Sequence, residues 1–472
     1  MKKVYIIYSI IAGIMLTACS DFLEESPSTG LPSEDAITTV TDLRNAVNGV
    51  AYFLSTNNSS KTVRMTYASD YGIYADLKGS DFEALSSNNH AGPLSRYTVT
   101  KYDGIPYDAY FFHYKALANV NKALEAAENL TVSNDEKTEY DNYVGELYAW
   151  RALIHFELAR IFCHAPTSAA DINAANSGIV LSTEVYATDY IGARTTLKET
   201  YDQILKDFET ALPLLSKGLT NGRINYWAAT ALRSRVHLYN GNNAAALADA
   251  KAVIAHTDYK LYSIDEYTKV WSQTYTSESL FELTVTSLYN PQRNSLGYYC
   301  SSDGYGECAF VEGGELLTYL QDHPEDVRSQ LAETQEGANP GVYPAKYPGR
   351  EGSIYANSPK VIRLADVYLI AAEAALKNGS TAEAASYVNT LRKNRITGYT
   401  DVSSITLDEI LFERRVELFA ENSMAFDYWR NKKSVVNPNA GEIKYDDYRT
   451  ILPIPQDEID LAPSILIQNP NY

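Results

Sequence analysis

The sequence contains few cysteines and histidines, and this scarcity disfavours several kinds of site. Its 472 residues include four cysteines and seven histidines, and no two histidines have the spacing of metal ligands. It also lacks a P-loop, a G-x-S-x-G motif, an H-E-x-x-H motif and a G-x-G-x-x-G motif after a strand. We therefore expect no metal, no cofactor and no enzymatic activity. Because the chain has 59 acidic residues, a glycosidase with a catalytic pair of carboxylates remains a less favoured alternative.

Positive charge is also scarce. The chain has 40 Lys and Arg against 59 Asp and Glu, which gives a formal net charge of −19 at pH 7. Such a field repels nucleic-acid phosphates and anionic lipids, so no nucleic-acid partner is expected. After the N-terminus, no segment is long and apolar enough to cross a bilayer, which takes roughly 20 residues.

The N-terminus has the pattern of a lipoprotein signal. Two lysines precede an apolar segment at 4–16, which has the length of a signal-peptide core and is too short to span a bilayer. The motif LTAC follows and ends at Cys19, as in a bacterial lipobox, where cleavage precedes a cysteine that is then acylated. We expect a signal peptide at 1–18 and a lipid, such as palmitate, on Cys19. An ordinary secretory signal with an incidental cysteine is the alternative.

The body of the chain has a helical pattern. Residues 20–40 are polar and rich in Pro, Ser, Thr and Gly, so 19–40 is expected to form a lipidated tether. From residue 41 onward, apolar residues recur at helical spacing, and Thr406 with Glu409 predicts a capping box. Helix pairs of about 34 residues, with alanine on the inner stripe, favour tetratricopeptide-like (TPR-like) hairpins. We expect one mainly α body over 41–472, with helical repeats at about 110–256 and 360–430 and an extended segment at 431–472.

Two long segments, about 60–108 and 257–358, lack the helical pattern and are rich in tyrosine. The whole chain has 38 Tyr against 13 Phe and 4 Trp. Tyrosine combines a flat apolar face with a hydroxyl group, which suits binding surfaces, and long ordered loops are usually functional. These segments therefore form the predicted ligand-binding region, with few short strands.

Within these loops, aromatic rings are candidates to stack on sugar rings while polar neighbours bind hydroxyl groups. For any single tyrosine, packing within the loop is the alternative. Tyr67, Tyr102, Tyr107 and Tyr275 belong to the same group, with Asn290 and Arg293 as polar partners. The principal ligand-binding candidates are Asp70, Tyr71, Tyr74, Tyr97, Trp271, Tyr289, Tyr298, Tyr299 and Tyr305.

Two cysteines frame the segment CSSDGYGEC. In an oxidising exported compartment, Cys300 and Cys308 are candidates for a disulfide that closes a small loop, and two unpaired thiols are the alternative. Cys163 lies on a helical stripe and is expected to be a small core residue.

Six stretches in order resemble one family. They are CSDFLEESP, GELYAWRALIHFELARIF, GARTTLKETYDQILKDFETALPLL, VIRLADVYLIAAEAAL, FERRVELFAEN and LPIPQDEIDLAPSILIQNPNY. Together they resemble the SusD/RagB family of outer-membrane nutrient-binding lipoproteins from residue 19 to 472. Departures occur at Met424, where the family has Arg, and at Ala462, where Asn is common; both concern the scaffold. The loops diverge most in this family, so no ligand residue is transferred by motif.

The resemblance implies a fold and a partner. The fold would be four TPR-like helical pairs that support an irregular ligand region. The helical face would contact a SusC-like TonB-dependent transporter, and the acids at Asp21, Glu24 and Glu25 resemble a signal for the cell surface. The protein would then be lipid-anchored in the outer membrane and carry glycans, or in a subset of the family peptides. The short chain favours trimmed loops and a small or peptide ligand.

Four hypotheses follow. The first is capture of an oligosaccharide and its delivery to the transporter, without any bond being broken. The second is capture of an oligopeptide by the same machinery, as in RagB-type proteins. A lipoprotein glycosidase and a helical adaptor without a small ligand are the alternatives from other classes.

Overall fold

The fold is described from a computed structural model, which describes residues 36–56, 64–86, 90–187 and 189–472. Within this part there are fifteen α-helices and eight short strands, so the predicted mainly α class is confirmed. The predicted signal peptide, Cys19 and most of the tether lie outside the described residues. No described helix is both long enough and apolar enough to cross a membrane.

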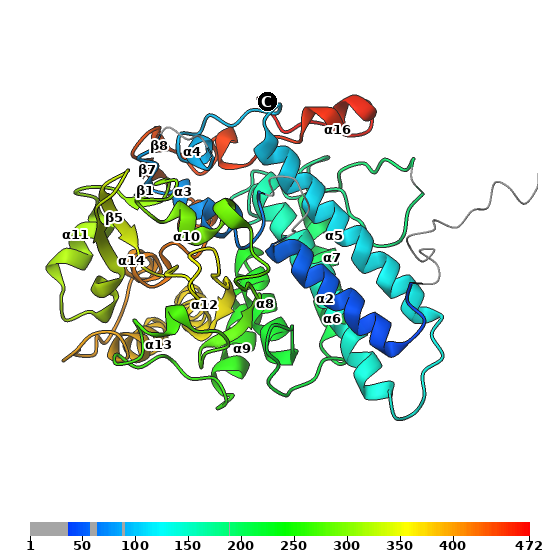
Figure 1. Ribbon diagram of the computed structural model, residues 1–472, viewed down its shortest axis with the longest axis horizontal. Helices are drawn as coiled ribbons and strands as arrows, with labels where there is room; N and C mark the ends of the chain where they lie inside the picture. Colours follow the sequence, from blue (N-terminus) through cyan, green and yellow to red (C-terminus); the bar gives the residue numbers. More distant parts are fainter. Residues whose placement is uncertain (1–35, 57–63, 87–89, 188) are drawn as a thin grey trace, which may run out of the picture.

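Four helices form one half of the molecule and lie side by side on the right of Figure 1. They are α2 (Val40–Ser55), α5 (Gly104–Glu128), α6 (Lys137–Phe162) and α7 (Leu197–Ala211). Helix α2 begins with a capping box between Thr39 and Asp42, and it buries one stripe that includes Leu43, Val47 and Val50. Its other face is left for the surface.

The second group of helices packs around α12. It comprises α8 (Tyr226–Tyr239), α9 (Asn243–Ile254), α12 (Leu364–Lys377), α13 (Thr381–Lys393), α14 (Leu407–Leu418) and α15 (Met424–Arg430). Ala371, Ala375 and Ala384 are completely buried, and such small side chains let α12 and its neighbours approach closely. The predicted capping box of Thr406 and Glu409 is present at the start of α14.

The strands are short and form four antiparallel pairs within the described residues. The pairing of β2 (Ser279–Glu282) with β6 (Lys360–Arg363) connects a predicted loop region to the start of α12. The other strands are β1 (Phe82–Glu83), β3 (Ala309–Phe310), β4 (Ala332–Gln335), β5 (Gly341–Pro344), β7 (Val435–Asn437) and β8 (Gly441–Ile443).

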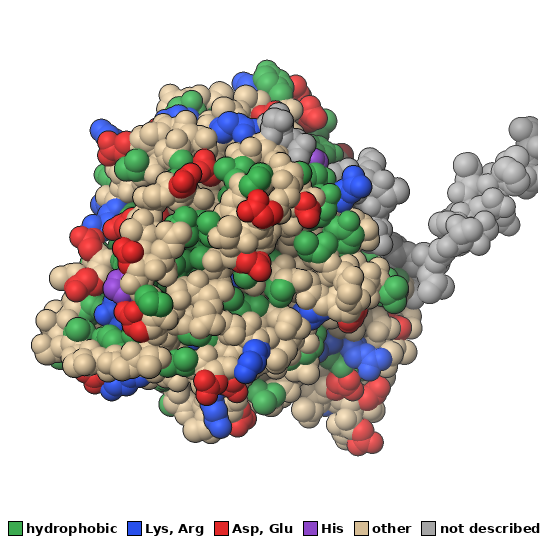
Figure 2. Space-filling view, turned by 60° about the vertical axis from the view of Figure 1, so that its left-hand side comes forward, with side chains coloured by type: hydrophobic (Ala, Val, Ile, Leu, Met, Phe, Trp, Pro, Cys, Tyr) green, Lys and Arg blue, Asp and Glu red, His purple; other side chains and the backbone are tan. Residues whose placement is uncertain are grey.

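Short helices occupy much of the remaining irregular chain. They include η1 (Asp70–Ile73), α3 (Tyr74–Leu77), α4 (Gly92–Ser95), η2 (Val270–Ser272), η3 (Gln292–Asn294), α10 (Leu296–Tyr299), α11 (Glu315–Asp322), η4 (Val327–Leu331), η5 (Tyr448–Thr450) and α16 (Gln456–Leu461). Helix α10 contacts η1 and η3, and Figure 1 shows α11 at the far left. On the face that Figure 2 shows, acidic and basic side chains are interspersed.

A buried ionic cluster lies where the C-terminal helices meet the loops. The carboxylate of Glu417 pairs with Arg363 at 2.6 Å, with Arg395 at 3.0 Å and with Arg328 at 3.1 Å. Burial alone would raise the pKa of Glu417, but these arginines hold that pKa well below its ordinary value. The cluster therefore joins η4, the start of α12 and the end of α13 to α14 with fixed geometry.

Candidate functional site

A surface groove lies between α2 and two loops, and we call it the α2 groove. Its volume is about 900 Å³, including its open mouth. It is formed by the outer face of α2, by the turn before α8 and by the loop after β2. The lining residues are Asn48, Ala51, Tyr52, Ser55, Asn221, Gly222, Arg223, Thr284, Thr286 and Tyr289.

Two exposed aromatic rings meet at this groove. The Tyr52 and Tyr289 ring centroids are 6.0 Å apart and their planes lie at 84°, and the two residues are 40% and 55% exposed. A turn fixes Tyr289, because the Thr286 N–H donates to the Tyr289 carbonyl and the buried Asn290 side chain donates to the Thr286 carbonyl. The rings thus present apolar surface to solvent from a rigid frame.

Polar groups complete the α2 groove. Arg223 donates from Nη1 to the Asn48 side-chain oxygen at 2.6 Å and from Nε to Glu146 at 2.9 Å. Gly222 has a φ of +70°, and a Cβ there would lie 2.9 Å from the Thr284 hydroxyl oxygen. A glycine is therefore needed where the turn approaches the loop after β2.

A second aromatic group, which we call the α10 cluster, consists of His90, Tyr298, Tyr305 and Tyr355. His90 stacks on Tyr305 with centroids 3.8 Å apart, and Tyr298 meets Tyr305 edge to face at 4.8 Å. The Glu307 carboxylate accepts the backbone N–H of His90 at 2.8 Å and thereby fixes the position of that ring. All four members of the cluster are partly exposed.

The structure separates the predicted ligand residues into two sets. Tyr289 is exposed in the α2 groove, and Tyr298 and Tyr305 lie in the α10 cluster. The other six have less than a tenth of their surface exposed, so they are core residues rather than a ligand surface, and this corrects the prediction for them. They are Asp70, Tyr71, Tyr74, Tyr97, Trp271 and Tyr299.

Their burial has identifiable causes. The hydroxyl groups of Tyr67 and Tyr71 both donate to the buried Glu157 carboxylate, so these rings are anchored inward. Asp70 is ion-paired with Arg64 at 3.1 Å, and Trp271 packs under the Lys346 ammonium group, which lies 4.7 Å from its ring centre. Sequence composition identified the tyrosine-rich loops but did not show which of their aromatic side chains are buried in the core.

The predicted disulfide is not formed in the structure. Cys300 and Cys308 are both buried and both are free thiols, next to each other at the end of α10 and before β3. Burial raises the pKa of the Cys308 thiol well above its ordinary value. Cys163 is also buried and free, as expected for a small core residue.

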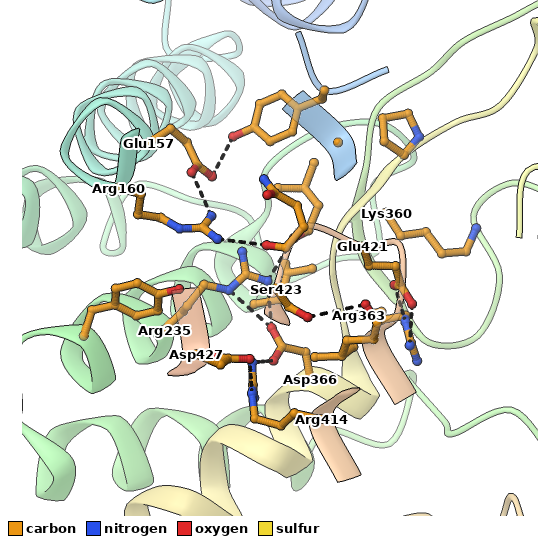
Figure 3. A pocket seen from close by; sticks show the side chains of 18 of the residues that line it. Glu157, Arg160, Arg235, Lys360, Arg363, Asp366, Arg414, Glu421, Ser423 and Asp427 are labelled. Atoms are coloured by element: carbon orange, nitrogen blue, oxygen red, sulfur yellow. Dashed lines mark hydrogen bonds and ion pairs between the residues drawn. The ribbon is translucent and has the colours of Figure 1, made fainter. Parts of the chain in front are cut away.

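A pocket of about 680 Å³, a volume that includes its open mouth, lies between α6 and the C-terminal helices and is lined by several charged side chains. Figure 3 shows Glu157 and Arg160 meeting on one side of it and Asp366, Arg414 and Asp427 on the other. Although burial raises the pKa of Asp366, Arg414 and Arg235 lower it to about 2. Because these charges are paired with one another, we assign the pocket to the scaffold rather than to ligand binding.

Sequence reasoning missed Tyr52, Asn48, Asn221 and Arg223. A signal for Tyr52 was available, because it lies outside the buried stripe of α2 and its ring is therefore placed toward solvent or a neighbouring loop. No local pattern pointed to Asn221 or Arg223, since only the folded chain brings the turn before α8 next to α2.

The geometry defines a class of protein: a helical scaffold that presents an aromatic, hydrogen-bonding groove at its surface. Among the described residues there is no cluster of side chains that could hold a metal ion. Residues 21–238 match the family described as "Starch-binding associating with outer membrane", and residues 312–472 match the SusD family. The chain belongs to the SusD/RagB family.

Individual relatives agree with this assignment. A SusD-like protein of Formosa agariphila is 26% identical, with both chains covered completely. A SusD superfamily structure from Bacteroides thetaiotaomicron is 31% identical, with a TM-score of 0.84, over 92% of this chain and 100% of that one. A laminarin-binding SusD-like protein, at 20% identity and a TM-score of 0.73 over 92% and 100% of the two chains, shares the fold.

Proposed function

We propose that this protein binds oligosaccharide in the α2 groove and at the α10 cluster. The observation that carries the proposal is the exposed pair Tyr52 and Tyr289 above a groove lined by amide and hydroxyl groups. Aromatic rings pack against the apolar faces of sugar rings, while amides and hydroxyl groups bind sugar hydroxyls. The description of the matching family as starch-binding supports the same ligand class.

The proposed mechanism is capture without cleavage. Most glycosidases hydrolyse a glycosidic bond with a pair of carboxyl groups that flank it. The ten described residues that line the α2 groove include no Asp or Glu. The ligand therefore leaves this groove chemically unchanged.

We further infer that the ligand passes to a SusC-like TonB-dependent transporter in the outer membrane. Family membership supports this step. In this proposal, residues 1–18 are removed, acylated Cys19 anchors the chain, and residues 19–40 tether the body at 41–472 at the cell surface.

The anchor has its own test. The Cys19→Ser variant should lose the incorporation of a labelled fatty acid and leave the membrane fraction. The matched control is Cys163→Ser, which changes a buried thiol elsewhere and should retain the lipid. Fatty acid on the Cys19→Ser variant would contradict the anchor.

Isothermal titration of the purified protein against an oligosaccharide panel and a peptide pool tests ligand capture. Tyr289→Ala should weaken oligosaccharide binding about tenfold, which corresponds to about 1.4 kcal/mol. Tyr102 is 76% exposed and lies outside the α2 groove, so Tyr102→Ala is the control and should bind normally. Heat with peptides and none with any oligosaccharide would overturn the proposal in favour of peptide capture.

A further inference from the structure

The α2 groove has an unusual charge for this protein. The chain carries 59 acidic against 40 basic residues, yet Arg223 is the one charged side chain among the described residues that line the groove. The remaining polar lining consists of amide and hydroxyl groups. The groove lining therefore carries one formal positive charge, on an arginine paired with Glu146, in a protein whose formal charge is −19.

Arg223 is held in place and has one nitrogen without a protein partner. Its Nε and Nη1 atoms donate to Glu146 and Asn48, whereas Nη2 is buried and has no acceptor among the described residues. The guanidinium centre lies 4.8 Å from the centre of the Tyr143 ring, which restrains its plane. A planar, oriented guanidinium is the side chain best suited to bind an oxyanion.

Glu146, the ion-pair partner of Arg223, offsets part of its charge from a buried position outside the groove lining. Glu146 is 1% exposed and does not line the groove. Burial raises the pKa of Glu146 to about 7, although Arg223 opposes this shift. Near neutral pH the buried carboxyl group therefore compensates only part of the arginine charge, and the groove side keeps the excess.

Asn48 adds a second donor. Because its side-chain oxygen accepts from Arg223, its amide N–H₂ group points away from that contact. Asn48 is exposed on the outer face of α2, in the same groove as Tyr52. The groove thus combines an aromatic face, a guanidinium group and an amide donor.

Acidic side chains next to the α2 groove are engaged elsewhere or line a different hollow. Glu351 accepts from the backbone N–H of Ser287 at 3.1 Å and from its hydroxyl group at 2.6 Å, in the loop after β2. Asp258 and Glu282 lie in a neighbouring depression that shares only Asn221 and Gly222 with the α2 groove. Glu282 is already engaged, since it accepts from Ser279 at 2.7 Å and pairs with Lys360 at 3.3 Å. A negatively charged ligand group would therefore be confined to the α2 side of the turn.

We infer that the α2 groove binds an acidic sugar unit, in which a carboxylate or a sulfate ester meets Arg223 and Asn48 while the ring packs on Tyr52 or Tyr289. This inference rests on the proposed oligosaccharide binding and specifies the chemical class of the ligand. The shared chemistry is an oxyanion on a sugar ring; uronic acids and sulfated sugars are its two sources.

The test is titration calorimetry with oligosaccharides of matched length that are neutral, uronic-acid-containing or sulfated. We expect one acidic series to bind at least tenfold more tightly than the neutral series, and the series that does so identifies the source. Raising the salt concentration to about 0.5 M, roughly three times physiological ionic strength, should reduce that advantage because the contact is ionic.

Two variants assign the effect to the groove. Arg223→Gln should remove the preference for acidic ligands, so that acidic and neutral series bind this variant with equal affinity. Since that change removes the arginine partner of Glu146, Asn48→Asp provides a second variant at an exposed position, whose carboxylate would occupy Arg223 and repel an acidic sugar. Arg44→Gln removes one exposed positive charge of α2 outside the groove and should leave the preference intact.

Three outcomes are decisive. Loss of the acidic preference in Asn48→Asp, with Arg44→Gln unchanged, supports the inference. Equal affinity for neutral and acidic ligands overturns it and leaves the proposed oligosaccharide binding intact. Absence of binding to every oligosaccharide overturns the proposed function and the inference together.

Discussion

Tyr52 of α2 and Tyr289 of the loop after β2 meet edge to face at the mouth of one groove, with ring centroids 6.0 Å apart. The first ring comes from the polar side of an amphipathic helix, and the second is carried by a turn in a tyrosine-rich loop. Their meeting assembles a binding surface from two distant parts of the chain.

Gly222 provides a test of how the turn before α8 shapes this surface. Gly222→Ala should destabilise the protein by about 1–3 kcal/mol, because a φ of +70° is unfavourable for other residues, and should weaken oligosaccharide binding because the new Cβ meets Thr284. Gly379 has a φ of +87° with open space around its Cβ position, so Gly379→Ala is a matched control. It should lose similar stability and bind normally. Unchanged binding by Gly222→Ala would contradict the role of this turn.

The buried cluster around Glu417 should be essential for folding. Glu417→Gln leaves Arg328, Arg363 and Arg395 without their shared counter-charge and should lower the free energy of unfolding by about 3–5 kcal/mol. Urea denaturation measures this change. Glu325 pairs with His323 at the surface, where the side chain is 46% exposed, so Glu325→Gln should cost less than about 1 kcal/mol. A similar small loss for both variants would refute the assigned role of the cluster.

Asp76 should make stability depend on pH. Burial raises its pKa to about 8, with Asp81 and Glu421 acting in the same direction and the Asn422 backbone and Lys346 opposing. Since the unfolded value is about 3.9, the folded state binds more protons, and this contribution to stability is lost as pH rises from about 4 to 8.

The variant Asp76→Asn mimics the protonated carboxyl group and can still accept the Asn422 N–H. At pH 8 it should be more stable than the parent protein by about 1.4 kcal/mol or more, with the difference shrinking towards pH 4. Thermal or urea unfolding at pH 5 and pH 8 measures the two slopes. Parallel stability curves for the two proteins would show that Asp76 does not titrate in this range.

Much of the scaffold could be predicted from local sequence. Apolar residues at helical spacing identified the helices, and the Thr406–Glu409 capping box is present as expected. These features follow from short-range chemistry, because a cap and an apolar stripe act within one or two helical turns. The start of α12 shows the limit of such local prediction. The helical repeats were expected from about residue 360, but Lys360–Arg363 forms β6 because it pairs with β2, which lies far away in the chain.

The candidate site was predicted only in outline. The tyrosine-rich loops include Tyr289, Tyr298 and Tyr305, which are accessible, but also Tyr71, which bonds through its hydroxyl group to Glu157 in the core. An exposed and a buried tyrosine have the same side chain, so the amino-acid composition of a loop does not show which of its tyrosines are buried. Only the positions of Glu157 on α6 and of the surrounding helices decide which rings turn inward.

By itself, the sequence determined the helical class, the family and the cationic, acidic and aromatic side chains available. Periodicity, capping and ordered motifs are properties of neighbouring residues, so they can be recognised in the sequence without knowing which distant segments are in contact. The tertiary structure alone decided that Asn48, Tyr52, Arg223 and Tyr289 would share one groove and that Cys300 and Cys308 would be buried free thiols. Those outcomes depend on which distant segments pack together, and packing is set by the whole core rather than by any local pattern.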